Sequence, residues 1–174
     1  MGSNPYSIRL AEAQDAAAIA ALIESAYRGD ESRRGWTTEA HLIEGNRTSV
    51  AEIAEFISAP EKRFVIALKG QQTVGCALIS NENGAGYFGM FAVRPDIQGG
   101  GLGKQILEFA EQKLREIWRC SQVTMTVISI RHELIAFYER RGYKQTSSKP
   151  FPFDQEPGAK RTDFHFVVLS KSFD

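Results

Sequence analysis

The sequence is poor in cysteine, proline and histidine, and it carries no net charge. Its 174 residues include two cysteines, six prolines and three histidines, while 21 basic side chains balance 21 acidic ones. Without an excess of either sign, the chain has no long-range field that would attract nucleic acid or an anionic membrane surface. Any anionic ligand must therefore be bound by local geometry, and we expect no nucleic-acid or membrane partner.

The few cysteines and histidines also exclude two kinds of structural support. Cys76 and Cys120 do not lie in a CxxC pair, so we expect buried, reduced thiols without a catalytic role rather than a disulfide framework. His41, His132 and His165 show no metal-ligand spacing, and we expect no metal. The first residues lack the apolar segment of a signal peptide, and no apolar run has the length of a membrane span. These features predict a cytoplasmic protein.

The hydrophobic pattern predicts a single domain over residues 1–174. Helices are expected after an N-cap at Asp15, and over residues 48–58, 104–118 and 133–141. Strands are expected at residues 6–10, 63–68, 73–80, 87–93, 123–128 and 163–169, with a further extended segment from Tyr143. The order is thus strand, two helices, three strands, helix, strand, helix and two strands.

The most informative segment is residues 91–104, in which an apolar strand and a proline precede a glycine cluster that opens a long helix. Backbone N–H groups converge there without obstruction by Cβ atoms, and the helix dipole favours an anion, so a phosphate is the expected occupant. A dinucleotide fingerprint fails, because the sixth position counted from Gly99 or Gly101 is not glycine. A P-loop fails as well, because Gln98 takes its first glycine position and Gln105 follows Lys104.

What does match is Gln98-x-x-Gly101-x-Gly103, which resembles the pyrophosphate-binding signature of the GNAT N-acetyltransferases. The resemblance covers nearly the whole chain. It implies the α/β (α+β) acyl-CoA N-acyltransferase fold, which has a central mixed, mostly antiparallel sheet of about seven strands flanked by about four helices.

A second segment, residues 131–143, is similar to the family's asparagine–alanine–tyrosine–glycine–aromatic stretch, and Tyr138 falls on the family tyrosine. The sequence departs from that pattern at Arg131, where the family often has Asn, and at Leu134, where it often has Ala. Arg131 would replace the usual asparagine contact with a charge.

The resemblance implies acetyl-CoA as the co-substrate. Its pantetheine arm would pair, like an added strand, with the backbone of Phe91, Ala92 and Val93, where the fourth and fifth strands splay apart. A backbone N–H in the region 90–92 would polarise the thioester oxygen. The residues expected to hold the pyrophosphate are Gln98, Gly99, Gly100, Gly101, Leu102, Gly103 and Lys104.

The implied reaction is direct attack of an amine on the thioester. Tyr138 is the expected proton donor to the departing thiolate, because a phenol pKa near 10 is close to the thiol's 8.5. The alternative for Tyr138 is a packed aromatic on an amphipathic helix. The base stays open among Glu39, Glu44, Glu82, His132 and a water relay.

Acceptor specificity in this fold comes from two connections, here residues 27–47 and 149–161. Their charges and aromatics suit a small zwitterion or polar amine, such as an amino acid or polyamine, or equally an ordinary polar surface. Three other functions remain open: an acyl-CoA sensor without catalysis, acetylation of a protein amine, and binding of another nucleotide. The apolar residues of the run 164–169 would permit a homodimer through the last strands.

Overall fold

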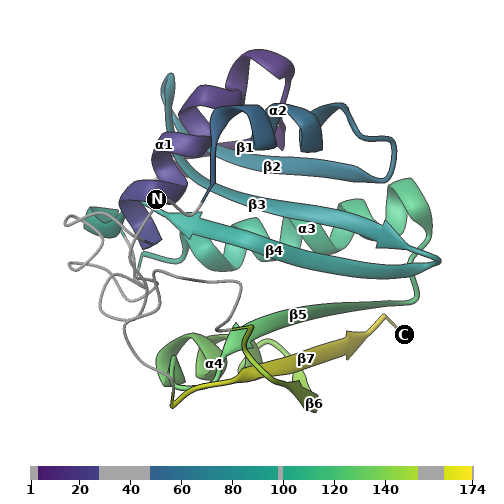
Figure 1. The fold of residues 1–174 in the computed structure, drawn as a ribbon. Helices are drawn as coiled ribbons and strands as arrows, with labels where there is room; N and C mark the ends of the chain where they lie inside the picture. The colour runs from purple at the N-terminus through teal and green to yellow at the C-terminus, as the bar shows by residue number, and fades with distance from the viewer. Residues whose placement is uncertain (1–3, 28–47, 98–99, 153–162, 174) are drawn as a thin grey trace.

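The computed structural model describes residues 4–27, 48–97, 100–152 and 163–173, which form one seven-stranded sheet with helices on both faces (Figure 1). The strands are β1 (Tyr6–Leu10), β2 (Lys62–Lys69), β3 (Gln72–Glu82), β4 (Ala85–Val93), β5 (Gln122–Ile128), β6 (Lys144–Lys149) and β7 (Phe166–Ser172). The helices are α1 (Ala16–Tyr27), α2 (Val50–Ser58), α3 (Leu102–Trp118) and α4 (His132–Glu139), with short 3-10 turns η1 (Ala13–Asp15) and η3 (Pro95–Ile97).

The strand order is β1-β2-β3-β4-β5-β7-β6, and every neighbouring pair is antiparallel except β4 and β5. The mixed, mostly antiparallel sheet that the family resemblance implies is therefore confirmed. None of the helices in the described ranges is long and apolar enough to cross a membrane.

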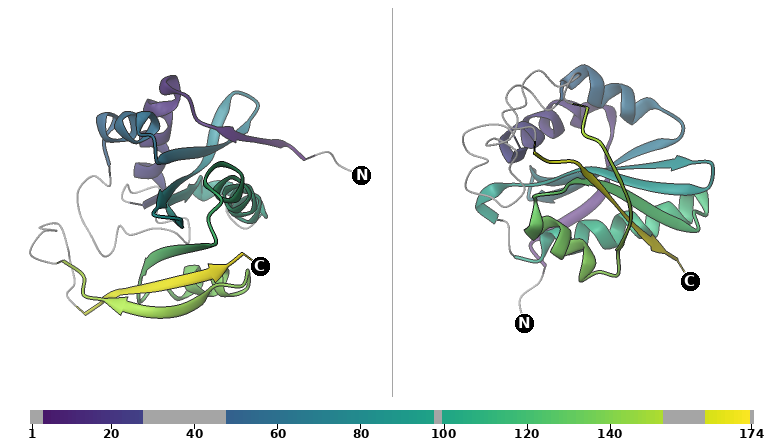
Figure 2. Two further views of the ribbon diagram at one scale, coloured as in Figure 1. Left: turned by 90° about the vertical axis from the view of Figure 1, so that its right-hand side faces the viewer. Right: turned by 60° about the horizontal axis from the view of Figure 1, so that its bottom comes forward.

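The sheet separates two hydrophobic cores because successive side chains of a strand point to opposite faces. In β2, Phe64 and Ile66 pack with α1 and α2, whereas Val65 and Ala67 pack with α3. Figure 2 shows α1 and α2 on one side of the sheet, and α3 and α4 on the other. The helix pair α3 and α4 is thus brought to one face, beside the middle of the sheet.

A β-bulge interrupts β4 near its middle. Cys76 pairs with Ala92 and Leu78 pairs with Gly89, so β4 has one more residue than β3 between the two pairs. Met90 lies at this bulge and has a φ of 46°, which few non-glycine residues adopt. A bulge bends its strand and increases the local twist.

The parallel pairing of β4 with β5 covers only three residue pairs, from Ala85 with Gln122 to Tyr87 with Thr124. Beyond this point the two strands diverge (Figure 1). On its other side, β5 pairs along its full length with β7. The splay that the family resemblance implies therefore begins at Tyr87, just before the bulge.

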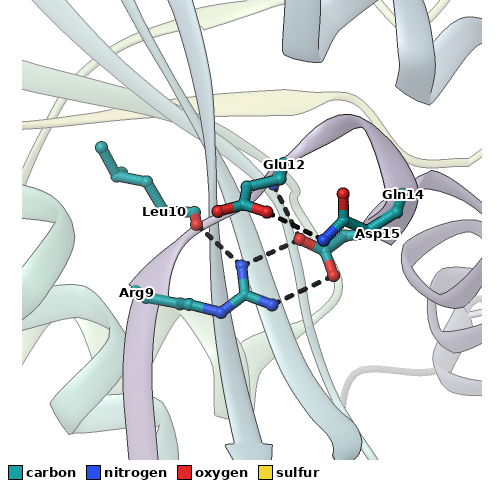
Figure 3. A network of polar contacts seen from close by, with 5 residues as sticks. All are labelled: Arg9, Leu10, Glu12, Gln14 and Asp15. Carbon is teal, nitrogen blue, oxygen red and sulfur yellow. Dashed lines mark hydrogen bonds and ion pairs between the residues drawn. The ribbon is translucent and has the colours of Figure 1, made fainter.

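The predicted N-cap role of Asp15 is wrong, because the structure uses this carboxylate to connect β1 to the start of α1 (Figure 3). Its Oδ2 accepts hydrogen bonds from Nη1 of Arg9 at 2.9 Å and from the backbone N–H of Glu12 at 2.7 Å. The bond from Arg9 holds the pKa of Asp15 below its usual range. The carboxylate therefore belongs to the capping box of η1, and α1 begins directly after Asp15, at Ala16, where the sequence predicts a helix.

The predicted final strand lies three residues too early, since β7 spans Phe166–Ser172. Phe164 instead packs against Phe151, with ring centroids 4.7 Å apart, in a small cluster that includes Ile128. Because β7 lies between β5 and β6, the apolar run proposed for a dimer is used inside this chain, where Val167 and Leu169 are buried.

Candidate active site

Gly101 is the N-cap of α3 and takes a φ of 87°. A Cβ at this position would meet no atom within 4 Å, so the backbone conformation, and not crowding, favours glycine. The helix starts at Leu102, two residues before the predicted Lys104, and the Leu102 side chain is buried. The first amides of a helix have no partner inside it, and the helix dipole makes this end attractive to anions.

Gly103 has a different reason to be glycine. A Cβ there would lie 3.0 Å from the ring of Phe91 and 3.4 Å from that of Phe137. These two rings stack with centroids 5.9 Å apart, and the guanidinium of Arg141 lies 4.0 Å from the centroid of Phe137 on α4. The missing side chain therefore allows α3 to pack closely against the aromatic stack.

A cleft of about 450 Å³ lies between the start of α3 and α4, and we call it the α3–α4 cleft. Its lining residues are Gly101, Gly103, Lys104, Glu133, Ala136, Phe137, Arg140 and Arg141. Three of these carry a positive charge and one a negative charge. The cleft thus adds cationic side chains to the N-terminus of α3, as an anion-binding site requires.

A second cavity, of about 70 Å³, lies where β4 and β5 diverge, and we call it the β4–β5 slot. Its lining residues are Tyr87, Phe88, Gly89, Met90, Phe91, Met125, Thr126, Val127, Ile128, Arg131, Leu134, Tyr138 and Phe166. The slot brings together three predicted site residues, Phe91, Arg131 and Tyr138. Arg131 lines the slot and not the α3–α4 cleft, so it lies by the opened strands and not beside the helix N-terminus.

Tyr138 is buried, with 3% of its surface exposed, and its ring contacts four other aromatic rings. The nearest is Phe137, with centroids 5.3 Å apart, and Tyr143 lies at 5.9 Å. The burial agrees with the packed-aromatic alternative. Tyr138 also lines the slot, and its role as general acid stays a prediction.

The other predicted cofactor residues are distributed around these two cavities. The side chains of Ala92 and Val93 are buried, so they offer only backbone groups to a ligand. Gly100 is exposed beside the start of α3. Gln98 and Gly99 lie outside the described residues.

Neither of the two candidate bases that the structure describes lies on the slot. Glu39 and Glu44 lie outside the described residues. Glu82 is exposed at the end of β3, and His132 is exposed at the first position of α4. Neither lines the slot, whose described lining has no Asp, Glu or His. The described part of the chain has no group of three or more His, Cys, Asp or Glu that could hold a metal.

Sequence reasoning missed the arginine pair of the cleft and the role of a cysteine beside the bulge. From the sequence, Arg140 and Arg141 were expected to be ordinary basic residues at a helix end, where they complement the helix dipole. Their place two and three residues after Tyr138, at the end of α4, was the signal that could have found them. Cys76 was expected to be only a buried thiol, and nothing in its neighbouring sequence indicates that it faces a bulge.

The comparison with protein families agrees with this arrangement of the site. The model of the Acetyltransferase (GNAT) family matches residues 22–143, well over half of the chain. The chain belongs to the GNAT acetyltransferase family. The match includes the bulged β4, the glycine cluster, α3, β5 and α4, and therefore the lining of both cavities except Phe166. Family membership supports acetyl transfer as the general chemistry of this GNAT protein.

Solved structures share the fold of this GNAT protein. The ribosomal-protein-S18-alanine N-acetyltransferase of Escherichia coli is 15% identical, with a TM-score of 0.72 over 96% of this chain and 93% of that one. The Salmonella typhimurium protein yncA, solved with its cofactor acetyl-CoA, is 18% identical, with a TM-score of 0.72 over 98% and 95%. A Bacillus anthracis protein in complex with acetyl coenzyme A is 21% identical, with a TM-score of 0.60 over 69% and 67%. At these identities the likeness shows the fold, and no curated protein matches the sequence.

Proposed function

We propose that this protein transfers the acetyl group of acetyl-CoA to a primary amine of a small molecule, and that one domain over residues 1–174 performs the reaction. The supporting observation is that consecutive residues of α4 line the α3–α4 cleft and the β4–β5 slot. Phe137 lines the cleft and Tyr138 lines the slot. One long ligand with an anionic end and an uncharged acyl end fits this pair of cavities.

The proposed binding mode follows the two cavities. The backbone of the glycine cluster and the N-terminus of α3 would hold the pyrophosphate, together with Lys104. The pantetheine arm would run along the backbone of Phe91, Ala92 and Val93 toward the slot, with Arg131 near its acyl end. The acetyl group would then lie beside Tyr138.

In the proposed reaction, the amine nitrogen forms a bond to the thioester carbon and the carbon–sulfur bond breaks. A backbone N–H at the bulge around Met90 would stabilise the negative charge that develops on the carbonyl oxygen. Tyr138 would protonate the departing sulfur. The ammonium would lose its proton to water or to one of the candidate bases outside the described residues, Glu39 or Glu44.

The acceptor class is tested by following release of the CoA thiol with a panel of amines. The panel contains amino acids, polyamines and short peptides, and the acetylated products are identified by mass spectrometry. Turnover of free amino acids or polyamines supports the small-molecule proposal. Turnover of peptides alone would favour acetylation of a protein amine, the chemistry named for the Escherichia coli structure.

A further inference from the structure

We propose that Arg140 and Arg141 form a second anion subsite in the α3–α4 cleft, which binds the 3′-phosphate of CoA and selects CoA over dephospho-CoA. This inference rests on the proposed function, because it assigns a part of the same ligand to residues that the family signature does not include. The glycine cluster and the α3 N-terminus serve the pyrophosphate, and the arginine pair serves the additional phosphate.

Glu133 lines the cleft with the two arginines and the charge of Glu108 acts on Arg141, but among the described residues neither arginine forms an ion pair with a carboxylate. Other cations of this chain do, such as Arg9 with Asp15 at 2.9 Å and Lys171 with Glu111 at 3.1 Å. Arg140 is exposed, and Arg141 is half-buried next to it. Two adjacent guanidinium groups that no carboxylate bridges repel each other, and an anionic ligand would reduce that repulsion.

Arg141 is also held in place before any ligand binds. Its Nη1 donates a hydrogen bond to the carbonyl oxygen of Phe137 at 2.8 Å, and its guanidinium stacks on the Phe137 ring. Its Nε is buried and has no hydrogen-bond partner in the described part of the structure. Burial, followed by the charge of Arg140, lowers the pKa of Arg141. A cation kept in such an unfavourable place is explained by a ligand more readily than by stability.

The chemistry of CoA fits the two walls of the cleft. Its diphosphate is attached to the 5′ oxygen of the ribose, and a phosphate monoester is attached to the 3′ oxygen of the same sugar. Gly101 and Lys104 approach the cleft from α3, whereas Arg140 and Arg141 approach it from the end of α4. A phosphate monoester carries close to two negative charges at neutral pH, and arginine pairs well with such a group. Dephospho-CoA lacks only this monoester.

The test is calorimetric titration of the whole protein with CoA and with dephospho-CoA. We expect the unmodified protein to bind CoA at least about tenfold more tightly than dephospho-CoA, a difference of about 1.4 kcal/mol. The exposed Arg140→Gln variant should weaken CoA binding about tenfold and leave dephospho-CoA binding unchanged. Lys144→Gln is the matched control, because it removes one charge from an exposed side chain that lines neither cavity.

Three results would overturn the inference. Equal binding of CoA and dephospho-CoA by the unmodified protein would mean that no group of the protein binds the 3′-phosphate. An Arg140→Gln variant that weakens both ligands equally would assign the arginine to the pyrophosphate. In both cases the acetyl-CoA function would stand. Binding of neither ligand would contradict the proposed function itself, and the subsite with it.

Discussion

The thiol of Cys76 donates a hydrogen bond to the carbonyl oxygen of Met90 at 3.6 Å, across the β-bulge of β4. The backbone N–H of Ala92 bonds to the same sulfur. One buried side chain therefore holds the backbone on both sides of Phe91. The shape of the bulge sets the direction of the N–H proposed to face the thioester oxygen, so a residue outside the slot would position a group inside it.

Replacing Cys76 tests this relationship. Cys76→Ala removes the bond to Met90 and leaves a small cavity, so unfolding should require about 1–2 kcal/mol less free energy. We expect kcat to fall several-fold with little change in the Kd of acetyl-CoA, while Cys76→Ser, which keeps a donor, retains more of kcat. If Cys76→Ala loses stability but keeps kcat, the thiol does not control the bulge.

Both cysteines should be unreactive in the folded protein. Burial raises the pKa of Cys76 to about 12, so almost none of this thiol is ionised at pH 8, and burial also raises the pKa of Cys120. A thiol titration at pH 8 should therefore detect neither cysteine until denaturant is added, when it should detect two. Rapid modification of the native protein would contradict the buried positions.

The raised pKa of Cys76 also predicts how stability depends on pH. A group with a pKa raised by folding contributes its full stabilisation below the pKa of the unfolded chain, which is 9.0 for this thiol, and loses it as the pH rises toward about 12. The free energy of unfolding should therefore decrease above pH 9, and the decrease should be smaller in Cys76→Ala. Equal slopes for both proteins would remove Cys76 as the cause.

The two glycines of the α3 start should respond differently to alanine. Gly101→Ala introduces only backbone strain, which costs about 1 kcal/mol. Gly103→Ala forces a Cβ against the Phe91 ring and should cost about 1–3 kcal/mol in denaturant unfolding. Gly70→Ala is the control for Gly101→Ala, because Gly70 has a φ of 62° and no atom near its Cβ position, yet lines neither cavity.

Acetyl-CoA affinity separates the two alanine variants from this control. We expect Gly101→Ala and Gly103→Ala to weaken acetyl-CoA binding, and Gly70→Ala to lose stability alone. Unchanged affinity in both helix variants would exclude the glycine cluster as the pyrophosphate site.

Tyr138 and Tyr143 provide a matched pair of buried phenols. Tyr138→Phe should lower kcat about a hundredfold and leave the Kd of acetyl-CoA unchanged, because it removes only the proton donor. Tyr143 donates its hydroxyl hydrogen to Glu111 at 2.7 Å and lines neither cavity, so Tyr143→Phe should cost about 1 kcal/mol of stability and keep kcat. The opposite pattern would assign Tyr138 a packing role.

Much of the fold could be predicted because the apolar periodicity of each segment is local. The strands from β1 to β5 and the helix α3 lie within two residues of their predicted bounds. The errors occur where the structure of a segment depends on a contact with an earlier part of the chain. Asp15 turns back to Arg9 on β1, and Phe164 leaves the predicted strand to pack against Phe151. Such pairings have no signature in the neighbouring sequence.

The candidate site also contains residues that the sequence could predict and residues that it could not. The glycine cluster and Tyr138 could be found because each lies in a short motif with fixed spacing. The arginine pair of the cleft depends on how α4 lies against α3, and the contact of Cys76 with Met90 depends on strand register. Neither relationship is visible before the chain is folded.

The central claim, that this protein uses acetyl-CoA, is tested most directly by its melting temperature with acetyl-CoA, CoA, NAD and ATP. A ligand at about a hundred times its Kd adds roughly 2.7 kcal/mol to the free energy of unfolding, which raises the melting temperature clearly. The account predicts such a rise with acetyl-CoA and CoA, and none of similar size with NAD or ATP. No response to either CoA compound, or a larger response to NAD or ATP, would contradict it.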